Sequence, residues 1–158
     1  MAAPIRIGTR GSALALFQAR QVADALRAAL PERGCEIETI RSAGDRSPDA
    51  PIASLGTGAF TGALQQALLD GRVDAAVHSL KDLPVGPTPG VTTIPVLERA
   101  DPRDALIDRL NRSLFNLPAG ARVGTGSPRR VAQLRRGRGD LDYAPIRGNV
   151  DTRLRKVA

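Results

Sequence analysis

Apolar and polar positions along the chain alternate between short strand-like runs and longer helix-like stretches. Apolar residues three or four positions apart predict a helix over 12–30 and a second over 59–69. The inward stripe of the first helix would contain Leu14, Gln18, Val22, Ala25, Leu26 and Ala29. Short apolar runs predict strands at 5–8, 36–40, 74–77 and 91–97. Residues 42–54 are rich in Ser, Pro, Asp and Gly, which is typical of a loop.

A charged stretch that contains Pro102 separates these elements from a second group. We expect a domain boundary here, with domain 1 at 1–98 and part of a domain 2 at 99–158. The second group is predicted to contain a helix at 105–110, a strand at 122–124, a helix at 128–136 and a strand at 143–146. The last twelve residues begin another helix.

Strands that alternate with helices indicate an α/β fold with mainly parallel sheets. No strand completes the second group, so we expect domain 2 to be incomplete and the chain to be a truncated form of a longer protein.

Composition limits what the core and the surface can be. Apolar residues make up 42% of the chain and aromatic residues only 3%, so the core must be built from Ala, Leu, Val and Ile. No apolar run approaches the ~20 residues that span a bilayer. The N-terminus lacks the basic start and long apolar stretch of a signal peptide. We therefore expect a cytoplasmic protein with no membrane partner.

The chain has one cysteine, Cys35, and one histidine, His78. A single cysteine excludes an internal disulfide framework and a multi-cysteine metal site. A zinc site would need carboxylates for most of its ligands. We expect no metal site.

The net charge of +7 is concentrated in the second part of the chain. From Arg99 onward there are 14 Lys and Arg against 6 Asp and Glu, whereas the preceding residues have 9 against 10. A concentrated basic surface indicates an anionic partner, either nucleic acid or a small molecule with several carboxylates or phosphates. Almost all of these cations are arginine, which suits bidentate recognition of carboxylate and phosphate. Some of them are also expected simply to cover solvated faces.

Two predicted strand-to-helix junctions resemble each other. The first is Gly8-Thr9-Arg10-Gly11-Ser12, and the second is Gly124-Thr125-Gly126-Ser127-Pro128-Arg129-Arg130. Each has glycine at a strand end, hydroxyl side chains, and arginine close to a helix N-terminus, where unpaired N–H groups favour anions. For either junction alone, the serine could simply cap its helix. Two such junctions together favour an anion cleft beyond the strand ends.

A third polar segment, 78–82, directly follows the predicted strand 74–77. Lys81 offers a cation for substrate carboxylates, and Asp82 offers a carboxylate for a developing positive charge or a proton transfer. On spacing alone, a surface Lys–Asp pair is at least as good an interpretation. His78 alone is better explained as a packed, hydrogen-bonded residue.

A fourth segment, 146–154, contains Arg147 at the end of a predicted strand and Arg153 early in the next helix. Both could face the same cleft. The simpler alternative is two solvated arginines.

Taken in order, these segments resemble the porphobilinogen deaminase (hydroxymethylbilane synthase) family. The similar stretches are 6–12, 76–84, 99–105, 123–130 and 146–150. Each stretch alone is weak, but five in series are highly specific.

The resemblance implies a transferase of tetrapyrrole biosynthesis. Members deaminate four porphobilinogen units and join them into hydroxymethylbilane on a dipyrromethane cofactor, which is thioether-linked to a cysteine. Each pyrrole carries an acetate and a propionate, which accounts for an arginine-lined cleft. The implied architecture is the two-domain, type II fold of periplasmic binding proteins, with a third domain that is absent here.

The resemblance also implies roles for individual residues. Asp82 falls on the catalytic aspartate. The positions that match cofactor or substrate carboxylate binding are Arg10, Ser12, Ser79, Lys81, Thr125, Ser127, Arg129, Arg130, Arg147 and Arg153. Porphobilinogen is the implied partner, and we expect a monomeric full-length form that binds no nucleic acid.

Two departures from the family pattern are visible. Thr57 and Gly62 stand where many members have lysine. The cofactor cysteine is expected beyond residue 158. Cys35 precedes the second helix and does not match the position of the family's cofactor cysteine. The 158-residue chain by itself is therefore expected to be inactive.

Other functions are compatible with parts of the pattern. The chain could be a catalytically inactive fragment or an anion-binding α/β module, such as a solute-binding protein. The missing signal peptide and the Lys81–Asp82 turn argue against solute binding. A nucleic-acid-binding protein ranks last, because three Phe and one Tyr leave little for base stacking.

Overall fold

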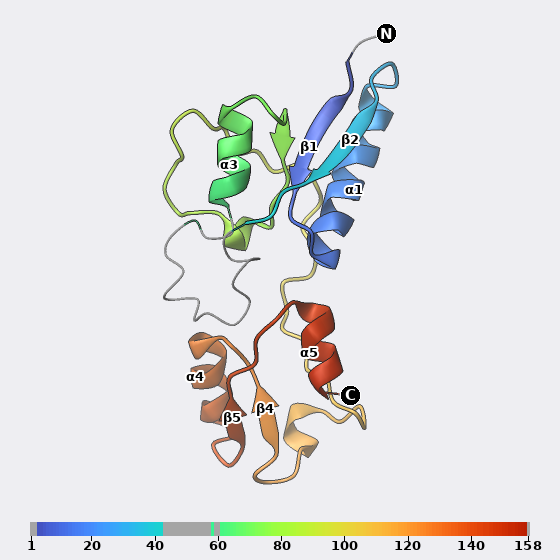
Figure 1. Ribbon diagram of the computed structural model, residues 1–158. Coiled ribbons are helices and arrows are strands. Elements are labelled where there is room, and N and C mark those ends of the chain that lie inside the picture. The colour runs from blue at the N-terminus through green and yellow to red at the C-terminus, as the bar shows by residue number, and fades with distance from the viewer. Residues whose placement is uncertain (1–2, 43–57, 59–60, 158) are drawn as a thin grey trace. The chain divides into compact units, whose positions relative to one another are not determined.

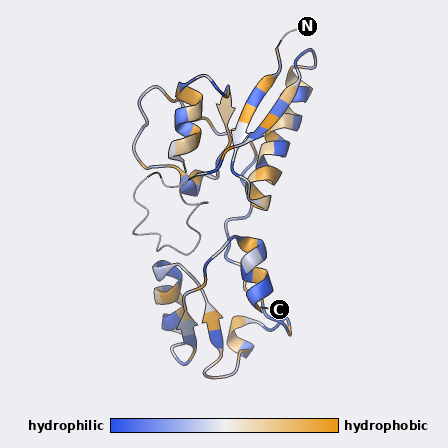
Figure 2. Ribbon diagram, viewed as in Figure 1, coloured by the Kyte–Doolittle hydropathy of each residue, from blue (hydrophilic) through white to orange (hydrophobic). Residues whose placement is uncertain are grey.

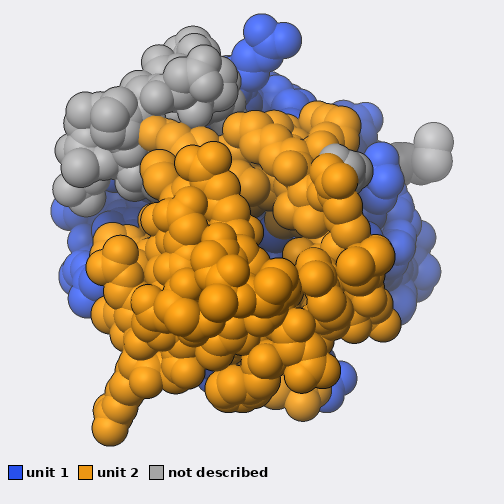
Figure 3. All heavy atoms as spheres, turned by 90° about the horizontal axis from the view of Figure 1, so that it is seen from below, with its two compact units in different colours: residues 1–99 blue, residues 100–158 orange. Residues whose placement is uncertain are grey.

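The computed structural model describes residues 3–42, 58 and 61–157. The chain divides into two compact units, one ending at Arg99 and the other beginning at Ala100, which are coloured separately in Figure 3. Each unit contains its own parallel β-strands and its own small apolar core. This is an α/β fold with parallel strands, as predicted.

The first unit is built on a three-stranded parallel sheet in the order β2-β1-β3. The strands are β1 (Ile5–Thr9), β2 (Cys35–Thr39) and β3 (Ala75–Ala76), all at predicted places (Figure 1). β1 occupies the centre, with Ile7 opposite Ile37 on one side and Ala75 on the other. All three strands end at the same edge of the sheet.

Helix α1 (Ala13–Ala29) covers one face of this sheet. Its buried residues are Ala19, Val22 and Ala23, and the two alanines pack against Ile7. The predicted stripe was partly wrong, because Leu14, Ala25 and Ala29 are exposed. Two alanines allow the helix backbone to lie close to the strands, so the inward face follows the small residues. Hydrophilic and hydrophobic residues alternate along this helix in Figure 2.

Helix α3 (Gly62–Leu69) packs on the other face of the sheet. Neighbouring residues of a strand point to opposite faces: Ile7 belongs to the cluster under α1, whereas Ala76, opposite Gly8, belongs to the cluster with α3. Gly71, at φ +66°, follows the C-terminal end of α3, in agreement with the predicted stop. Residues 59–60, where this helix was predicted to begin, lie outside the described residues, as does almost all of the loop predicted at 42–54.

The strand predicted at 91–97 is not present. Ile94, Val96 and Leu97 are exposed, and no strand of the described residues pairs with the segment. Pro95 removes one of the N–H groups that a ladder would need. The apolar run was correctly identified, but a run without a neighbouring strand cannot form a sheet.

The second unit contains two parallel strands, β4 (Arg122–Gly124) and β5 (Asp142–Ala144), joined by helix α4 (Pro128–Gly137). Helix α5 (Val150–Val157) follows β5. All four elements were predicted. Leu117, Val123 and Leu141 form the buried centre, with Leu134 of α4 packed against it.

The helix predicted at 105–110 is wrong, and the segment is irregular. The carboxylate of Asp108 accepts hydrogen bonds from the backbone N–H groups of Leu110 and Arg112, both at 3.0 Å. A side chain that binds the backbone in this way offers an alternative to helix, which is why Asp favours turns. Asn111, at φ +52°, completes the turn.

Arg138 fixes the loop that precedes β4. Its guanidinium donates to the carbonyl oxygens of Leu114 and Leu117, at 2.5 and 2.7 Å, and to Asp140. Leu114 begins a short 3-10 helix, η3 (Leu114–Asn116). Among the described residues, none of the helices combines the length and apolar character that crossing a membrane requires.

Candidate functional site

The ends of β1 and β3 bring together two segments that are far apart in sequence. Gly8 and Ala76 are the last paired residues, and the N–H of Val77 donates to the carbonyl of Gly8 at 2.9 Å. Because the two strands are parallel, the residues that follow each leave the sheet at the same edge. Arg10 and Ser12 follow β1, whereas the 78–82 segment follows β3.

Asp82 is the last residue of a short 3-10 helix, η2 (Leu80–Asp82), and its N–H donates to the carbonyl of Ser79 at 2.9 Å. Its Oδ2 lies 3.9 Å from Nη1 of Arg10, with 30% of the Asp82 side chain and 14% of the Arg10 side chain exposed. This separation is an ion pair but too long for a hydrogen bond. The Asp82 carboxylate can therefore still accept hydrogen bonds from a ligand. Lys81, beside it, is exposed.

Gln18 connects this turn to α1. The hydroxyl of Ser79 donates to Oε1 of Gln18 at 2.9 Å, and both residues are half-buried. Sequence reasoning placed Gln18 on the inward stripe of the helix but gave it no function. An amide within a predicted apolar stripe was the signal that could have identified it.

Ser12 caps α1, as predicted: its Oγ accepts a hydrogen bond from the N–H of Ala15 at 3.3 Å. The cap uses the oxygen of the hydroxyl as an acceptor, so the O–H group can still donate to an anion. Thr9, fully buried, donates to the carbonyl of Ala15 at 3.2 Å. The first junction therefore has one hydroxyl that is structural and one that remains accessible to a ligand.

His78 lies in the same turn, and its Nε2 is buried with no hydrogen-bond partner among the described residues. Burial lowers the pKa of His78 below its usual value. The charge of Asp82 opposes this shift, and that of Arg10 adds to it. The imidazole is therefore neutral at pH 7. The sequence predicted a packed, hydrogen-bonded histidine, and this prediction is wrong for Nε2 within the described residues.

In the second unit, the ends of β4 and β5 form the other junction. Ser127 caps α4, and its Oγ accepts from the N–H of Arg130 at 3.4 Å. Its own N–H donates to Oγ1 of Thr125 at 3.2 Å, and the N–H of Thr125 donates to Ala144 at 3.0 Å. Pro128 occupies the first helical position, as predicted. The two hydroxyl residues lie together at the helix N-terminus.

A shallow pocket of about 250 Å³ opens at this helix N-terminus. Its lining residues come from the junction, from α4 and from the end of β5: Thr125, Gly126, Ser127, Pro128, Val131, Tyr143, Ala144 and Pro145. Two predicted site residues, Thr125 and Ser127, therefore share one pocket.

Arg129 and Arg130 of α4 both contact Asp104, which sequence reasoning did not select. Nη2 of Arg130 donates to Oδ1 of Asp104 at 2.7 Å, and Nη2 of Arg129 lies 3.6 Å from its Oδ2. The hydrogen bond from Arg130 holds the pKa of Asp104 below its usual range. The position of Asp104 inside a charged stretch that resembles the family was the available signal.

Arg147 and Arg153 lie around the turn that begins α5. Nε of Arg153 donates to the carbonyl of Gly148 at 2.8 Å, so part of this side chain stabilises the turn. Gly148 has φ +107°, and a Cβ at this position would lie 2.7 Å from Cγ2 of Thr152. The backbone carbonyl of Arg147 accepts from Lys156 at 3.2 Å.

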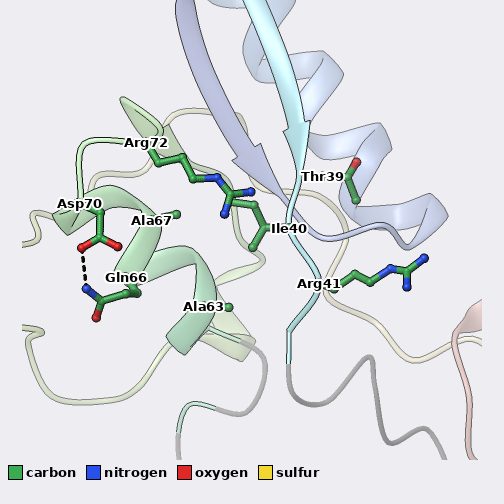
Figure 4. Close-up of a pocket in the computed structure, with 8 residues that line it drawn as sticks. All are labelled: Thr39, Ile40, Arg41, Ala63, Gln66, Ala67, Asp70 and Arg72. Atoms are coloured by element: carbon green, nitrogen blue, oxygen red, sulfur yellow. Dashed lines mark hydrogen bonds between the residues drawn. The ribbon is translucent and has the colours of Figure 1, made fainter.

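A larger pocket, of about 350 Å³, lies at the end of β2 beside α3 (Figure 4). None of the predicted site residues lines it. Two of its polar groups, Gln66 and Asp70, bond to each other at 2.7 Å, and Arg72 bonds to Glu38 at 2.7 Å. Its polar rim is thus largely paired within the protein.

Among the described residues, no three His, Cys, Asp or Glu side chains are grouped in a way that could hold a metal ion. Cys35 opens β2 and packs beside the core of the first unit. Its carbonyl accepts from Arg27 at 3.2 Å. It lies in a strand, away from the Asp82 turn.

Comparison with known proteins identifies the family. The sequence pattern described as "Porphobilinogen deaminase, dipyromethane cofactor binding domain" matches residues 5–158. The chain belongs to the porphobilinogen deaminase family. The porphobilinogen deaminase of Syntrophus aciditrophicus is 53% identical over 155 residues, which is 98% of this chain and 51% of that protein. The corresponding protein of Syntrophomonas wolfei is 49% identical over 154 residues, 97% of this chain and 50% of its own length.

The porphobilinogen deaminase of Mycobacterium tuberculosis is 54% identical over 154 residues, which is 98% of this chain and 49% of that protein. The chain therefore spans about half the length of the curated relatives it matches. The matched domain is the cofactor-binding part of the porphobilinogen deaminase family, and the attachment cysteine is not in this segment.

Proposed function

We propose that this chain supplies the catalytic aspartate and part of the carboxylate-binding surface of a hydroxymethylbilane synthase. In this activity four porphobilinogen units are deaminated and joined into hydroxymethylbilane. The observation that carries the proposal is the placement of Asp82 opposite Arg10, at adjoining strand ends, in a chain that matches the family's cofactor-binding domain.

The proposed architecture is the type II, two-domain fold of periplasmic binding proteins. Domain 1 would comprise 1–98, and 99–158 would be part of domain 2. Parallel strands with polar residues at their carboxyl ends in each unit support this proposal. We further propose that the protein acts in the cytoplasm as a monomer, with porphobilinogen and not nucleic acid as its partner. The low aromatic content of 3% agrees with the last point.

Asp82 is the proposed catalytic residue. Loss of ammonia from porphobilinogen breaks a carbon–nitrogen bond and leaves a positive charge shared between the pyrrole nitrogen and the exocyclic carbon. A carboxylate that is partly buried stabilises this charge more than one in bulk water. The free α-carbon of the terminal pyrrole of the growing chain then forms a carbon–carbon bond to that exocyclic carbon and loses its α-proton, for which Asp82 is a suitable acceptor.

Arg10 would orient this carboxylate. Its side chain is 14% exposed, so its charge is only weakly screened, yet at 3.9 Å it makes no tight hydrogen bond to Asp82. A looser ion pair allows the carboxylate to face a pyrrole N–H. Ser79, held by Gln18, fixes the backbone of the turn on the other side.

The residues present fit a dipyrromethane group. Such a group has pyrrole N–H donors and several carboxylates, and it supplies the pyrrole carbon from which the chain grows. Asp82 would accept hydrogen bonds from the N–H groups, whereas Arg10, Lys81 and Ser12 would bind carboxylates. The hydroxyl of Ser79 would do so by exchanging its bond to Gln18 for one to the ligand. The buried Nε2 of His78 in this turn has no hydrogen-bond partner among the described residues, and a bound molecule could supply one.

In the second unit, the proposed carboxylate-binding groups are Thr125, Ser127, Arg129, Arg130, Arg147 and Arg153. The helix N-terminus adds N–H groups and a positive dipole end. The pocket at the start of α4 would receive an acetate or propionate side chain of the substrate.

The proposal is tested with Asp82→Asn in the protein encoded by the complete gene. This change keeps the size of the side chain and removes its charge. We expect porphobilinogen consumption to fall by a factor of roughly 10² or more, while the far-UV circular dichroism spectrum stays unchanged. Asp70→Asn, at the end of α3, removes another acidic group of the same unit and should leave the rate as it was. Equal rates for Asp82→Asn and the unsubstituted protein would remove Asp82 from the chemistry.

An anion-binding module without catalysis is the second candidate. The capped N-terminus of α4, with its pocket and two arginines, supports it because none of these features depends on Asp82. Binding of porphobilinogen without release of ammonia by the complete protein would favour this alternative.

A further inference from the structure

We propose that Asp104 is a positioning residue, which holds Arg129 and Arg130 in the orientation that receives a ligand carboxylate. The inference rests on the proposed function for the identity of that ligand. Asp104 belongs to an irregular stretch of the second unit and reaches α4 from outside the helix.

A carboxylate near the N-terminus of helix α4 would stabilise it. Arg129 and Arg130 follow Pro128 in its first turn, where the positive end of the helix dipole disfavours cations. The first turn contains no acidic residue of its own. Asp104 supplies the missing negative charge, and one negative charge against two guanidinium groups leaves a net positive charge for a ligand.

The carboxylate of Asp104 spans the two arginines, with Oδ1 at 2.7 Å from Arg130 and Oδ2 at 3.6 Å from Arg129. Consecutive side chains on a helix diverge by about 100°. A single carboxylate that contacts both therefore draws the two guanidinium groups toward one side.

Arg130 is held at two points. Its backbone N–H is bound by the Ser127 hydroxyl at 3.4 Å, and its guanidinium is bound by Asp104. Its Nε is buried and has no hydrogen-bond partner among the described residues. A flexible arginine would turn such an N–H group toward water, so the buried Nε indicates a side chain that is constrained.

Arg129 is held in a similar way. Its Nη1 donates to Oε1 of Gln133 at 2.6 Å, one helical turn away, and its Nη2 faces Asp104. Both guanidinium groups thus contact Asp104, and that of Arg129 is also bound by Gln133.

The pairs are too exposed to be explained by stability alone. The Asp104 side chain is 46% exposed and that of Arg130 is 42% exposed. Ion pairs at such positions contribute little to folding, because water screens the charges. Orientation of the arginines is the effect that remains.

The test compares Asp104→Asn, Asp104→Glu and the control Asp142→Asn in the complete protein. Asp142 is a suitable control, because it is an exposed aspartate of the same unit that pairs with Arg122 at 3.4 Å, at the beginning of β5. Steady-state rates with porphobilinogen would give KM and kcat separately, and thermal unfolding would monitor the fold.

We expect Asp104→Asn to raise KM about tenfold with kcat changed less than twofold, since a positioning residue acts on carboxylate binding. Asp104→Glu should recover part of the affinity, and Asp142→Asn should leave KM unchanged. A KM for Asp104→Asn equal to that of the control would overturn the inference. If Asp104→Asn does not fold, Asp104→Ser, which also removes the charge, replaces it: a raised KM supports the inference and a KM equal to that of the control overturns it.

A second measurement does not depend on the activity. The Nε–H resonance of Arg130 in a ¹⁵N correlation spectrum should be protected from solvent exchange in the unsubstituted protein and lose that protection in Asp104→Asn. If the complete protein does not consume porphobilinogen, the proposed function fails, whereas the resonance still tests the orientation. Equal protection in both proteins would show that Asp104 does not hold Arg130.

Discussion

Nη1 of Arg10 lies 3.9 Å from Oδ2 of Asp82, although the two residues follow different strands. The pairing of β1 with β3 produces this proximity, because the strands are parallel and end together. Neither residue alone distinguishes a functional site from a surface charge. Their arrangement, with a half-buried histidine in the same turn, can be measured directly.

His78 is the only histidine of the chain, so its titration reports on this arrangement without ambiguity. The negative charge of Asp82 raises the pKa of His78 and the positive charge of Arg10 lowers it. We therefore expect Asp82→Asn to lower the pKa further and Arg10→Gln to raise it toward its usual value. Titration of the imidazole protons by NMR measures both shifts.

Lys81→Gln provides the matched control for this titration. Lys81 is exposed and lies in the same turn, but it does not contribute to the shift of His78. Its removal should leave the titration unchanged. Shifts of the same sign for Arg10→Gln and Asp82→Asn would contradict the arrangement of charges described above.

The two capping serines should contribute to stability as well as to ligand binding. Ser12 and Ser127 each accept a backbone hydrogen bond at a helix start, so substitution by alanine should cost about 1 kcal/mol of unfolding free energy. Chemical denaturation followed by circular dichroism at 222 nm measures the loss. Ser113→Ala serves as the control, because Ser113 precedes η3 without a side-chain capping bond. Ser127→Ala and Ser113→Ala with equal stability would argue against the cap.

Stability should fall in acid partly through Asp74. The guanidinium of Arg6 bonds to this carboxylate and lowers the pKa of Asp74 from 3.8 to about 2. A carboxyl whose pKa is lower in the folded state stabilises the protein above its unfolded pKa, and this contribution is lost as the pH falls. The loss should occur between about pH 4 and pH 2.

The measurement is the denaturation midpoint as a function of pH, for the unsubstituted protein and for Asp74→Asn. The midpoint of the variant should depend less steeply on pH within that window, and the two curves should converge at low pH. Parallel curves down to pH 2 would mean that the Arg6–Asp74 pair does not couple to folding.

Gly148 should tolerate no side chain. Its φ of +107° is unfavourable for other residues, and a Cβ would lie 2.7 Å from Thr152. We expect Gly148→Ala to destabilise the second unit by roughly 1–3 kcal/mol. Gly62→Ala is the control, because a Cβ there contacts none of the described residues within 4 Å and Gly62 begins α3. That substitution should be neutral or slightly stabilising. Thermal unfolding measures both effects, and equal losses would contradict this explanation.

The family resemblance also implies a lysine in many members at the position of Gly62. A Cβ at this position contacts none of the described residues within 4 Å. The other such position, Thr57, lies outside the described residues.

Local patterns were sufficient to predict much of the fold. The periodicity and the serine cap placed α1 within one residue at each end, and Ser127 with Pro128 placed the start of α4. These signals are contained in a few neighbouring residues. The failures needed information from elsewhere in the chain: 91–97 has the composition of a strand but no partner strand among the described residues.

In the candidate site too, residues with a local sequence signal were predicted, and residues that depend on contacts with other elements were not. Motifs selected Asp82 and the arginines, because the chemistry of these residue types and their order along the chain are visible in the sequence. Gln18 and Asp104 were missed, because their importance depends on contacts with Ser79 and Arg130 from distant elements. The helix predicted at 105–110 failed for a local reason, since the side chain of Asp108 binds the backbone N–H groups of Leu110 and Arg112 that a helix would use.

Because β3 is short, the segment that precedes it cannot change in length without displacing the residues that follow. Only two residue pairs, Ile7 with Ala75 and Gly8 with Ala76, join β3 to the central strand. Adding or deleting one residue between Asp70 and Asp74 would move the following segment by about 3.3 Å along the strand and turn its side chains to the opposite face. Asp82 would then lose its place opposite Arg10 even though both residues were retained. We therefore expect functional variants to contain no insertion or deletion between Asp70 and Asp74. The length of this segment determines the geometry of the site as much as the identity of Asp82 does.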